Sequence, residues 1–189
     1  MRPSIWPSTR RRTPTSNRGG WCLPAGPARG RLKDALFSVA DHEAPHIPAL
    51  PEAFEHYRYE LGGRGLRFDG YPYRRHRETR AAVMRNFDFF GAPLAGIVGM
   101  HRDLGPADAV SVGMYLQTLV LALTARGLGT CVEVSVAGYP DVVRTELKIP
   151  PELTIICGLA VGYSDPDFPA NKSRIGRDPV AKHVVFLDN

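Results

Sequence analysis

The stretch "ADAVSVGMYLQTLVLALTARGLGTCVEVS", residues 107–135, decides the fold. Its first 20 residues are nearly all apolar and predict one long helix. Two glycines end this helix, and the β-branched residues after them predict a return to extended chain. A helix of this length could cross a membrane. Asp108 and Gln117 interrupt it, however, and no second span exists, so a core or dimer helix is favoured.

Short apolar runs in the rest of the chain predict a sheet. Residues 92–101, "APLAGIVGMH", and 153–163, "LTIICGLAVGY", are predicted to be buried strands. Residues 183–187, "HVVFL", predict a strand that pairs at a sheet edge or exchanges with a partner. Strands so few and so separated do not close a barrel, which favours an α+β fold with a buried central helix. Further helices are expected near residues 29–40, 51–63, 74–90 and 140–148.

The positive charge is concentrated at one end of the chain. The net charge is +5, yet residues 1–33 hold eight basic residues and no acid, whereas the remainder holds 16 basic and 19 acidic residues. A basic tail on a mildly acidic domain argues against nucleic-acid binding. Residues 1–30 are also rich in Arg, Pro, Gly and Ser, and predict an atypical, poorly ordered segment. We therefore expect one folded domain over residues 31–189.

The cysteines and the chain start indicate a compartment. Cys22, Cys131 and Cys157 are odd in number and lack metal-ligand spacing, so neither a disulfide framework nor a cysteine zinc site is expected. The chain start has no apolar signal-peptide core. We expect a cytoplasmic protein that binds neither nucleic acid nor membrane.

Several local motifs admit two interpretations. "HEAPH" at 42–46 matches the H-E-x-x-H metalloprotease pattern, but Pro45 opposes the helix that the pattern requires, so a solvated loop and no metal site are expected. Cys131 has no neighbouring base or cation, which favours a structural thiol over a nucleophile. Residues 74–80, "RRHRETR", are either a solvated helix face or a site for the 2′-phosphate of NADPH. The aromatic residues of 56–73 either pack the loop or cover a flat substrate.

The order of features over residues 111–180 resembles a known family. A small-residue helix with Gln117 is followed by the Gly-Leu-Gly-Thr-Cys exit, a Tyr-Pro-Asp helix start, an Ile-Pro linker, a Cys-Gly strand and a basic run after Asn171. This order resembles the C-terminal half of the FMN-dependent nitroreductase family, and residues 85–98 extend the resemblance. It implies an α+β fold with a mixed or antiparallel sheet, and a homodimer with the flavin at the subunit interface.

The resemblance also implies an activity. It predicts an FMN-dependent NAD(P)H oxidoreductase that reduces nitroaromatics, quinones or activated alkenes by ping-pong hydride transfer. In such an enzyme the flavin performs the redox chemistry, so no catalytic side chain is expected. By position, the backbone of Val134 and Ser135 would face the edge of the flavin ring. The basic run predicted to hold the FMN phosphate comprises Lys172, Arg174 and Arg177.

The N-terminal segment departs from the family pattern. In "TPTSNRGGW", residues 13–21, Ser16 and Asn17 remain in register with a family flavin-binding motif and are predicted cofactor ligands. Two glycines replace the Gln and Pro of that motif, and no counterpart of the family's opening Arg-x-Ser-Arg helix is seen. This departure leaves an alternative, a degenerate protein of the same fold that binds flavin weakly or not at all and acts as a non-catalytic binding protein.

Overall fold

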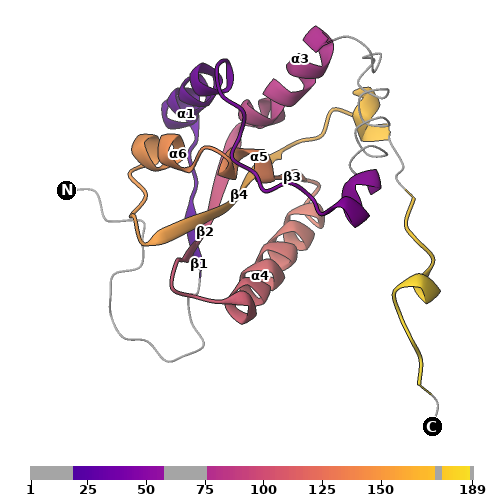
Figure 1. Cartoon of the computed structure of the whole chain (residues 1–189). Helices are drawn as coiled ribbons and strands as arrows, with labels where there is room; N and C mark the ends of the chain where they lie inside the picture. Colours follow the sequence, from indigo (N-terminus) through magenta and orange to yellow (C-terminus); the bar gives the residue numbers. More distant parts are fainter. Residues whose placement is uncertain (1–18, 58–75, 173–175, 188–189) are drawn as a thin grey trace. The chain divides into compact units, whose positions relative to one another are not determined.

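A computed structural model describes residues 19–57, 76–172 and 176–187 (Figure 1). These residues fall into two compact units, each of which is described by itself. The first unit holds residues 19–49 and 80–164, and the second holds the described residues from 50 to 79 and from 165 onward. Three predicted site residues, Ser16, Asn17 and Arg174, lie outside the described residues, as does most of the aromatic stretch 56–73.

The first unit is built on an antiparallel sheet of four strands in the order β1-β2-β4-β3. The strands are β1 (Gly19–Cys22), β2 (Leu94–His101), β3 (Gly129–Glu133) and β4 (Leu153–Gly162). The strands predicted at 92–101 and 153–163 are confirmed, and the sheet resolves the mixed-or-antiparallel alternative as antiparallel. β1 forms inside the segment that was predicted to be irregular, because pairing with β2 supplies order that its local composition does not.

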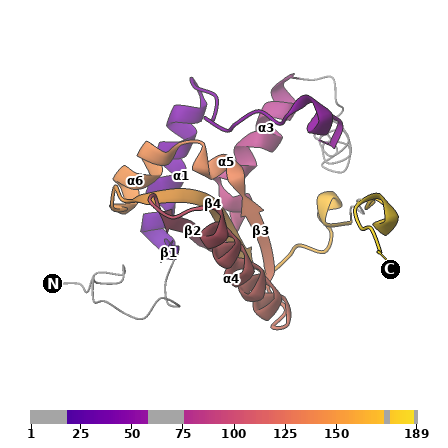
Figure 2. The ribbon, with the colours of Figure 1, turned by 60° about the horizontal axis from the view of Figure 1, so that its bottom comes forward.

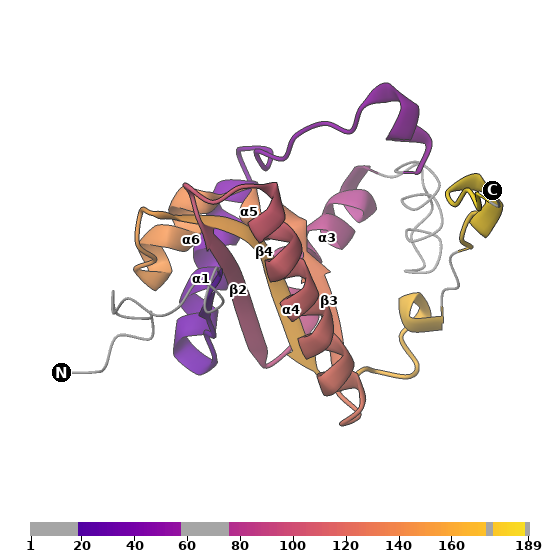
Figure 3. The same ribbon diagram turned by 90° about the horizontal axis from the view of Figure 1, so that it is seen from below.

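Helices cover both faces of this sheet. The longer helices are α1 (Gly26–Ala40), α3 (His76–Phe87), α4 (Pro106–Thr124) and α6 (Pro140–Leu147), and α5 (Val134–Ala137) is a single turn. Figures 1 and 2 show α1 and α6 on one side of the sheet and α4 on the other, and Figure 3 shows α4 running alongside β3. α1 begins at Gly26, earlier than predicted, because Pro27 is well suited to the first turn of a helix.

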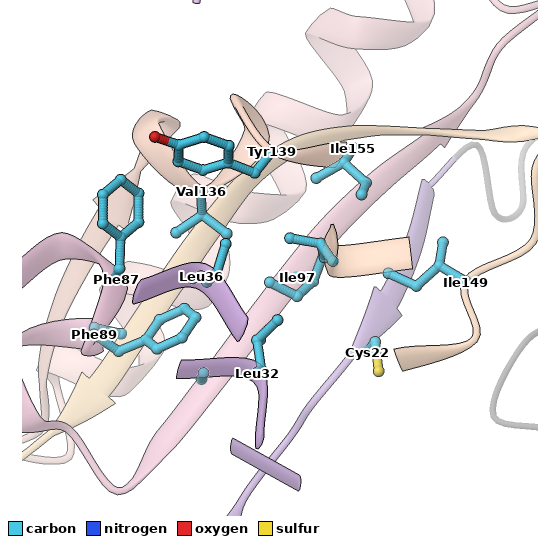
Figure 4. Close-up of a cluster of buried hydrophobic side chains, with 13 residues drawn as sticks. Cys22, Leu32, Leu36, Phe87, Phe89, Ile97, Val136, Tyr139, Ile149 and Ile155 are labelled. Atoms are coloured by element: carbon cyan, nitrogen blue, oxygen red, sulfur yellow. The ribbon is translucent and has the colours of Figure 1, made fainter. Parts of the chain in front are cut away.

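The larger of two buried clusters lies between the sheet and the layer of α1, α5 and α6. Figure 4 shows Phe87, Phe89 and Val136 at one end of this cluster, and Cys22 and Ile149 at the other. The second cluster, on the α4 side, is much smaller and consists of Val98, Met100, Val112 and Cys157. The two faces of the sheet therefore contribute unequally to the core.

The long helix predicted as a core or dimer helix is not buried in the single chain, which leaves the dimer helix as a prediction. Val112 is the one residue of α4 in the buried class, and only 6% of the helix's most apolar 18-residue window is buried. α4 is long and apolar enough to cross a membrane by length and composition, a test that helices of soluble proteins also pass. The helix is exposed because it packs one narrow stripe on the sheet and no other element of the first unit covers its remaining surface. The large exposed side chains on it are Val110, Met114, Tyr115 and Leu121.

The second unit contains short helical turns, namely η1 (Glu52–Phe54), η3 (Pro169–Lys172) and η4 (Val180–Lys182). Asp178 accepts hydrogen bonds from the Tyr57 hydroxyl at 2.7 Å and from Lys182 Nζ at 3.0 Å, and lies 3.1 Å from His183 Nε2. These contacts, that of Tyr57 foremost, hold the pKa of the Asp178 carboxyl well below its usual range. Residues 183–187 form no strand in the described chain, where they are exposed, so the predicted pairing at a sheet edge is not found; exchange of this segment with a partner stays a prediction. β-Branched and aromatic residues favour a strand, but a strand forms only where another strand is available for pairing.

Gly158, in the middle of β4, generates a prediction about packing. A Cβ there would lie 3.1 Å from Val136 Cγ2 and 3.4 Å from Phe89 Cε1, both on fully buried side chains. We expect Gly158→Val to lower the free energy of unfolding by about 2–3 kcal/mol, since overpacked cores are strained. Urea denaturation measures the change. Gly30→Val is the matched control, because nothing lies within 4 Å of its Cβ position, and an equal loss in both variants would contradict the prediction.

Candidate functional site

The stretch between α4 and α6 folds as a strand that turns directly into a short helix. Gly127 has a φ of 76°, the left-handed conformation in which glycine commonly ends a helix, and Leu128 N–H donates to Leu123 O at 3.1 Å. β3 then pairs with β4, and α5 follows without an intervening loop. We call residues 132–135 the β3–α5 junction. Pairing with β4 on one side and the buried Val136 on the other fix its position.

Successive side chains at the β3–α5 junction face opposite sides of the sheet. Val132 is 46% exposed and Val134 is 55% exposed, whereas Glu133 between them is 1% exposed. This alternation is the normal pleat of a strand. Glu133 lies opposite Gly158, whose absent Cβ would point at Val136 and Phe89, so the carboxyl group lies on the side of the large core. The junction therefore exposes apolar side chains on one side and buries an acid on the other.

Val134 and Ser135 are the first two residues of α5. The N–H groups in the first turn of a helix have no acceptor within that helix, so they can donate to another group. Val134 is exposed and Ser135 is half-buried. Their role as backbone donors to a flavin stays a prediction, and their position at a surface-exposed turn is compatible with it.

Glu133 is the one polar side chain in the buried class among the described residues. Neither of its carboxyl oxygens has a hydrogen-bond partner. Burial raises the pKa of Glu133 from its ordinary value of 4.5 to about 8, although the charge of Arg29 acts to lower it. At neutral pH this carboxyl group is therefore mostly protonated and uncharged.

Arg29, on α1, is engaged by an acid other than Glu133. Its Nη2 donates to Asp88 Oδ1 at 3.0 Å and to the Asp88 carbonyl, and Lys33 Nζ lies 3.2 Å from the same Oδ1. The Arg29 guanidinium also lies 5.9 Å from the centroid of the Phe89 ring. Arg29 Nε is buried and has no partner. Asp88 thus holds both cations of this part of α1.

The chain after Asp88 is strained. Phe89, Phe90 and Gly91 have φ values of 48°, 51° and 77°, and two successive non-glycine residues in the left-handed region are unusual. Such strain persists where surrounding contacts enforce it. Phe89 is fully buried, and Gly91 N–H donates to Asp88 O at 2.8 Å. The turn η2 (Phe89–Gly91) is therefore held firmly between α1 and β4.

Cys131 and the "HEAPH" stretch both lie within the described residues. Cys131 is an exposed residue, yet partial desolvation of its thiol and the nearby Glu133 raise its pKa to about 11, so the thiol is protonated at neutral pH. Residues 42–46 form a turn and loop after α1, as predicted, with His46 Nε2 2.9 Å from Glu43 Oε1. Within the described ranges, no group of three or more His, Cys, Asp or Glu residues could hold a metal ion.

The predicted phosphate-binding residues lie in the second unit. Lys172 ends η3 and is exposed, with its Nζ 3.7 Å from Asp167 Oδ1. Arg177 is exposed and donates to the Gly176 carbonyl at 3.2 Å. Val134 and Ser135 belong to the first unit, so each predicted group is described within its own unit.

Sequence analysis missed the group of Glu133, Arg29 and Asp88. One local signal was available, since an acid between two β-branched residues must face away from both in a strand. Nothing local could have indicated that Arg29 and Asp88, 59 positions apart, would meet beside it.

The antiparallel sheet, with its main helical layer on one face and the β3–α5 junction at its edge, gives an α+β fold of the kind that the resemblance implies. Residues 28–163 match the Nitroreductase family. This match spans more than two thirds of the chain, which therefore belongs to that family.

Curated relatives cover part of the chain. It is 40% identical to the 4-nitrobenzoate reductase of Nocardioides sp. (strain LMS-CY) over 103 residues, which are 54% of this chain and 42% of that protein. It is 34% identical to the nitrobenzene nitroreductase of Ectopseudomonas oleovorans over 108 residues, which are 57% of this chain and 48% of that protein. The chain thus spans about half the length of these relatives.

Solved structures share the fold. The FMN and NADPH-dependent nitroreductase NfnB from sphigopyxis sp. strain HMH is 22% identical, with a TM-score of 0.85 over 91% of this chain and 81% of that one. The FMN-dependent nitroreductase NfnB from Mycobacterium smegmatis is 24% identical, with a TM-score of 0.82 over 90% of this chain and 79% of that one. At this identity the likeness establishes the fold alone.

The buried carboxyl group generates a prediction about pH and stability. The pKa of Glu133 is about 8 in the folded state and ordinarily 4.5, so between these values the folded state binds more protons than the unfolded state. The free energy of unfolding should therefore fall as the pH rises through this window, by about 3 kcal/mol between pH 4.5 and pH 7. Glu133→Gln should remove this loss.

Urea denaturation of both proteins at several pH values measures the effect. Glu152→Gln, at an exposed acid just before β4, is the matched control and should keep the wild-type pH dependence. A Glu133→Gln variant with the same pH dependence as the wild type would show that Glu133 is not the group responsible.

Proposed function

We propose that the chain acts as an FMN-dependent NAD(P)H oxidoreductase that reduces nitroaromatic compounds. The observation that carries the proposal is the β3–α5 junction, an exposed strand-to-helix turn inside the residues that match the Nitroreductase family. The names of the curated relatives, a nitrobenzoate reductase and a nitrobenzene nitroreductase, support nitroaromatics as the substrate class. Quinones and activated alkenes are further acceptors consistent with the same chemistry.

In each unit, the described residues are of a kind that suits one part of a flavin mononucleotide. Val132 and Val134 offer exposed apolar surface on which a flat ring can pack, and the backbone at Val134 and Ser135 offers N–H donors to ring acceptors. Glu133 points into the core, so no carboxylate from the junction opposes an electron-rich ring. In the second unit, Lys172 and Arg177 present exposed cationic side chains of the kind that bind phosphate.

Bound FMN would supply the hydride-transfer chemistry. The part of the chain would be to bind and orient it, with Val134 and Ser135 fixing the ring edge through their backbone, and Lys172, Arg174 and Arg177 neutralising the phosphate. Ser16 and Asn17 would complete the site from the N-terminal segment. No side chain is assigned as a general acid or base, because the proposed reaction does not require one.

We also propose that the chain forms a homodimer through α4. Val110, Met114 and Leu121 are each at least 60% exposed on this helix, and Tyr115 is 58% exposed. A contiguous apolar surface of this kind normally marks an interface. A second copy is favoured over lipid as its cover, because α4 carries Asp108 in its first turn and packs Val112 against the sheet.

The proposed cofactor leads to a spectroscopic prediction. The purified protein, mixed with FMN and then desalted, should retain flavin absorption near about 370 and 450 nm, and NADPH or NADH should bleach it. A nitroaromatic such as 4-nitrobenzoate should restore the absorption, because reduced flavin is reoxidised by the substrate. A protein that releases all added FMN would instead support the alternative of a degenerate, non-catalytic binding protein.

The proposed dimer leads to a prediction about mass in solution. Sedimentation equilibrium should give twice the chain mass for the wild type. Met114→Asp should shift the protein toward monomer, since a charge buried at an interface without a partner is strongly unfavourable. Thr145→Asp, at an exposed position of α6 on the other face of the sheet, is the control and should stay dimeric. A monomeric wild type at micromolar concentration would refute the assignment.

A further inference from the structure

The described residues contain three buried side-chain atoms without a hydrogen-bond partner, and these atoms belong to two residues. They are Arg29 Nε and the two carboxyl oxygens of Glu133. Leaving a buried polar group unpaired is costly, more so if it is charged. Glu133 directly precedes Val134, the first residue of the predicted cofactor-contacting segment. An acid kept unpaired at such a position indicates a role beyond packing.

The cations near Glu133 are already engaged. Arg29 is bound to Asp88 through Nη2, and Lys33 contacts the same Asp88 oxygen at 3.2 Å. Asp88 leads into η2, whose left-handed backbone holds Phe89 against Gly158, the cross-strand neighbour of Glu133. Arg29 therefore cannot move to Glu133 without releasing Asp88.

The remaining surroundings give Glu133 no compensating charge. α5 contributes no titratable side chain, and β3 and β4 contribute only the thiols of Cys131 and Cys157, whose pKa values Glu133 helps to raise. The other charged groups near Glu133 are Arg29 and Lys33 from α1 and Asp88 before η2, whereas Arg31 and Asp34 of α1 are exposed. An ionised Glu133 would thus be a buried charge without an ion-pair partner, because Arg29 is already bound to Asp88. Burying the protonated, neutral carboxyl group costs less free energy.

We propose that Glu133 and Arg29 are positioning residues for the β3–α5 junction, and that the junction is firmly closed only while Glu133 carries its proton. When Glu133 ionises, the junction gains free energy by opening the carboxylate to water, unless Arg29 is free to pair with it. The consequence for the cofactor rests on the proposed function, since it assumes that the backbone of Val134 and Ser135 contacts FMN.

Hydrogen–deuterium exchange on the full-length protein without FMN tests the positioning role. After correction for intrinsic rates, protection of the amides of residues 133–137 should fall at least tenfold between pH 5.5 and pH 7.5, because opening is then coupled to loss of a proton. Glu133→Gln should abolish this fall, and the exposed Glu152→Gln should preserve it.

The variant Asp88→Asn distinguishes the proposed positioning role of Glu133 and Arg29 from a role in packing alone. This substitution frees Arg29 to pair with an ionised Glu133, so the fall in protection should become smaller although an ion pair has been lost. A wild type with pH-independent protection at 133–137 would overturn the proposal without any variant. So would a Glu133→Gln protein that keeps the wild-type fall.

A second measurement distinguishes this inference from the proposed function. The dissociation constant of FMN, followed by flavin fluorescence, should rise about tenfold from pH 7 to pH 9 in the wild type and stay unchanged in Glu133→Gln. If the wild type binds no FMN at any pH, the proposed function fails while the exchange data still decide the role of Glu133. If FMN binds and exchange is independent of pH, the proposed function stands and the positioning role is overturned.

Discussion

The first unit depends on the pairing of β4 with β2 on one side and β3 on the other. The side chains of this central strand enter both layers: Ile155 and Ala160 enter the large core, whereas Cys157 enters the small one. The register with β2 shifts between Val98 and Gly99, whose partners are Cys157 and Ile155, so Ile156 of β4 is the extra residue that separates these sets. A slip of one residue between β3 and β4 would turn Glu133 outward and bury its exposed neighbours.

The unequal cover of the two faces follows from this arrangement. α1, α5 and α6 close one face with a large cluster of buried side chains, while α4, the one helix on the other face among the described residues, contributes Val112 to a small cluster. Most of the apolar surface of α4 therefore stays exposed in the single chain. The length and apolar composition of α4 suggest a core helix, but in this fold they give an exposed apolar surface. We therefore propose a homodimer that covers this surface.

Glu133 is an exception to the rule that buried acidic side chains have hydrogen-bond or ion-pair partners. The side chain is buried because the pleat of β3 and the absent side chain of Gly158 direct it inward, and the nearby Arg29 is held by Asp88. Sequences that fold well break such local rules mainly at functional sites. The location of this departure, one residue before the predicted cofactor contacts, agrees with that expectation.

The sequence by itself determined the α+β class, the strands at 92–101 and 153–163, the helices at 107–126 and 140–148, and the family, since apolar runs, glycine and proline signals and the order of motifs are local properties. Only tertiary structure decided the order of the sheet, the ordering of Gly19–Cys22 into β1, the exposure of α4 and the failure of residues 183–187 to form a strand. It also decided the meeting of Arg29 and Asp88 beside Glu133. Each of these features depends on contacts with residues that are distant in the sequence, and local composition does not predict such contacts.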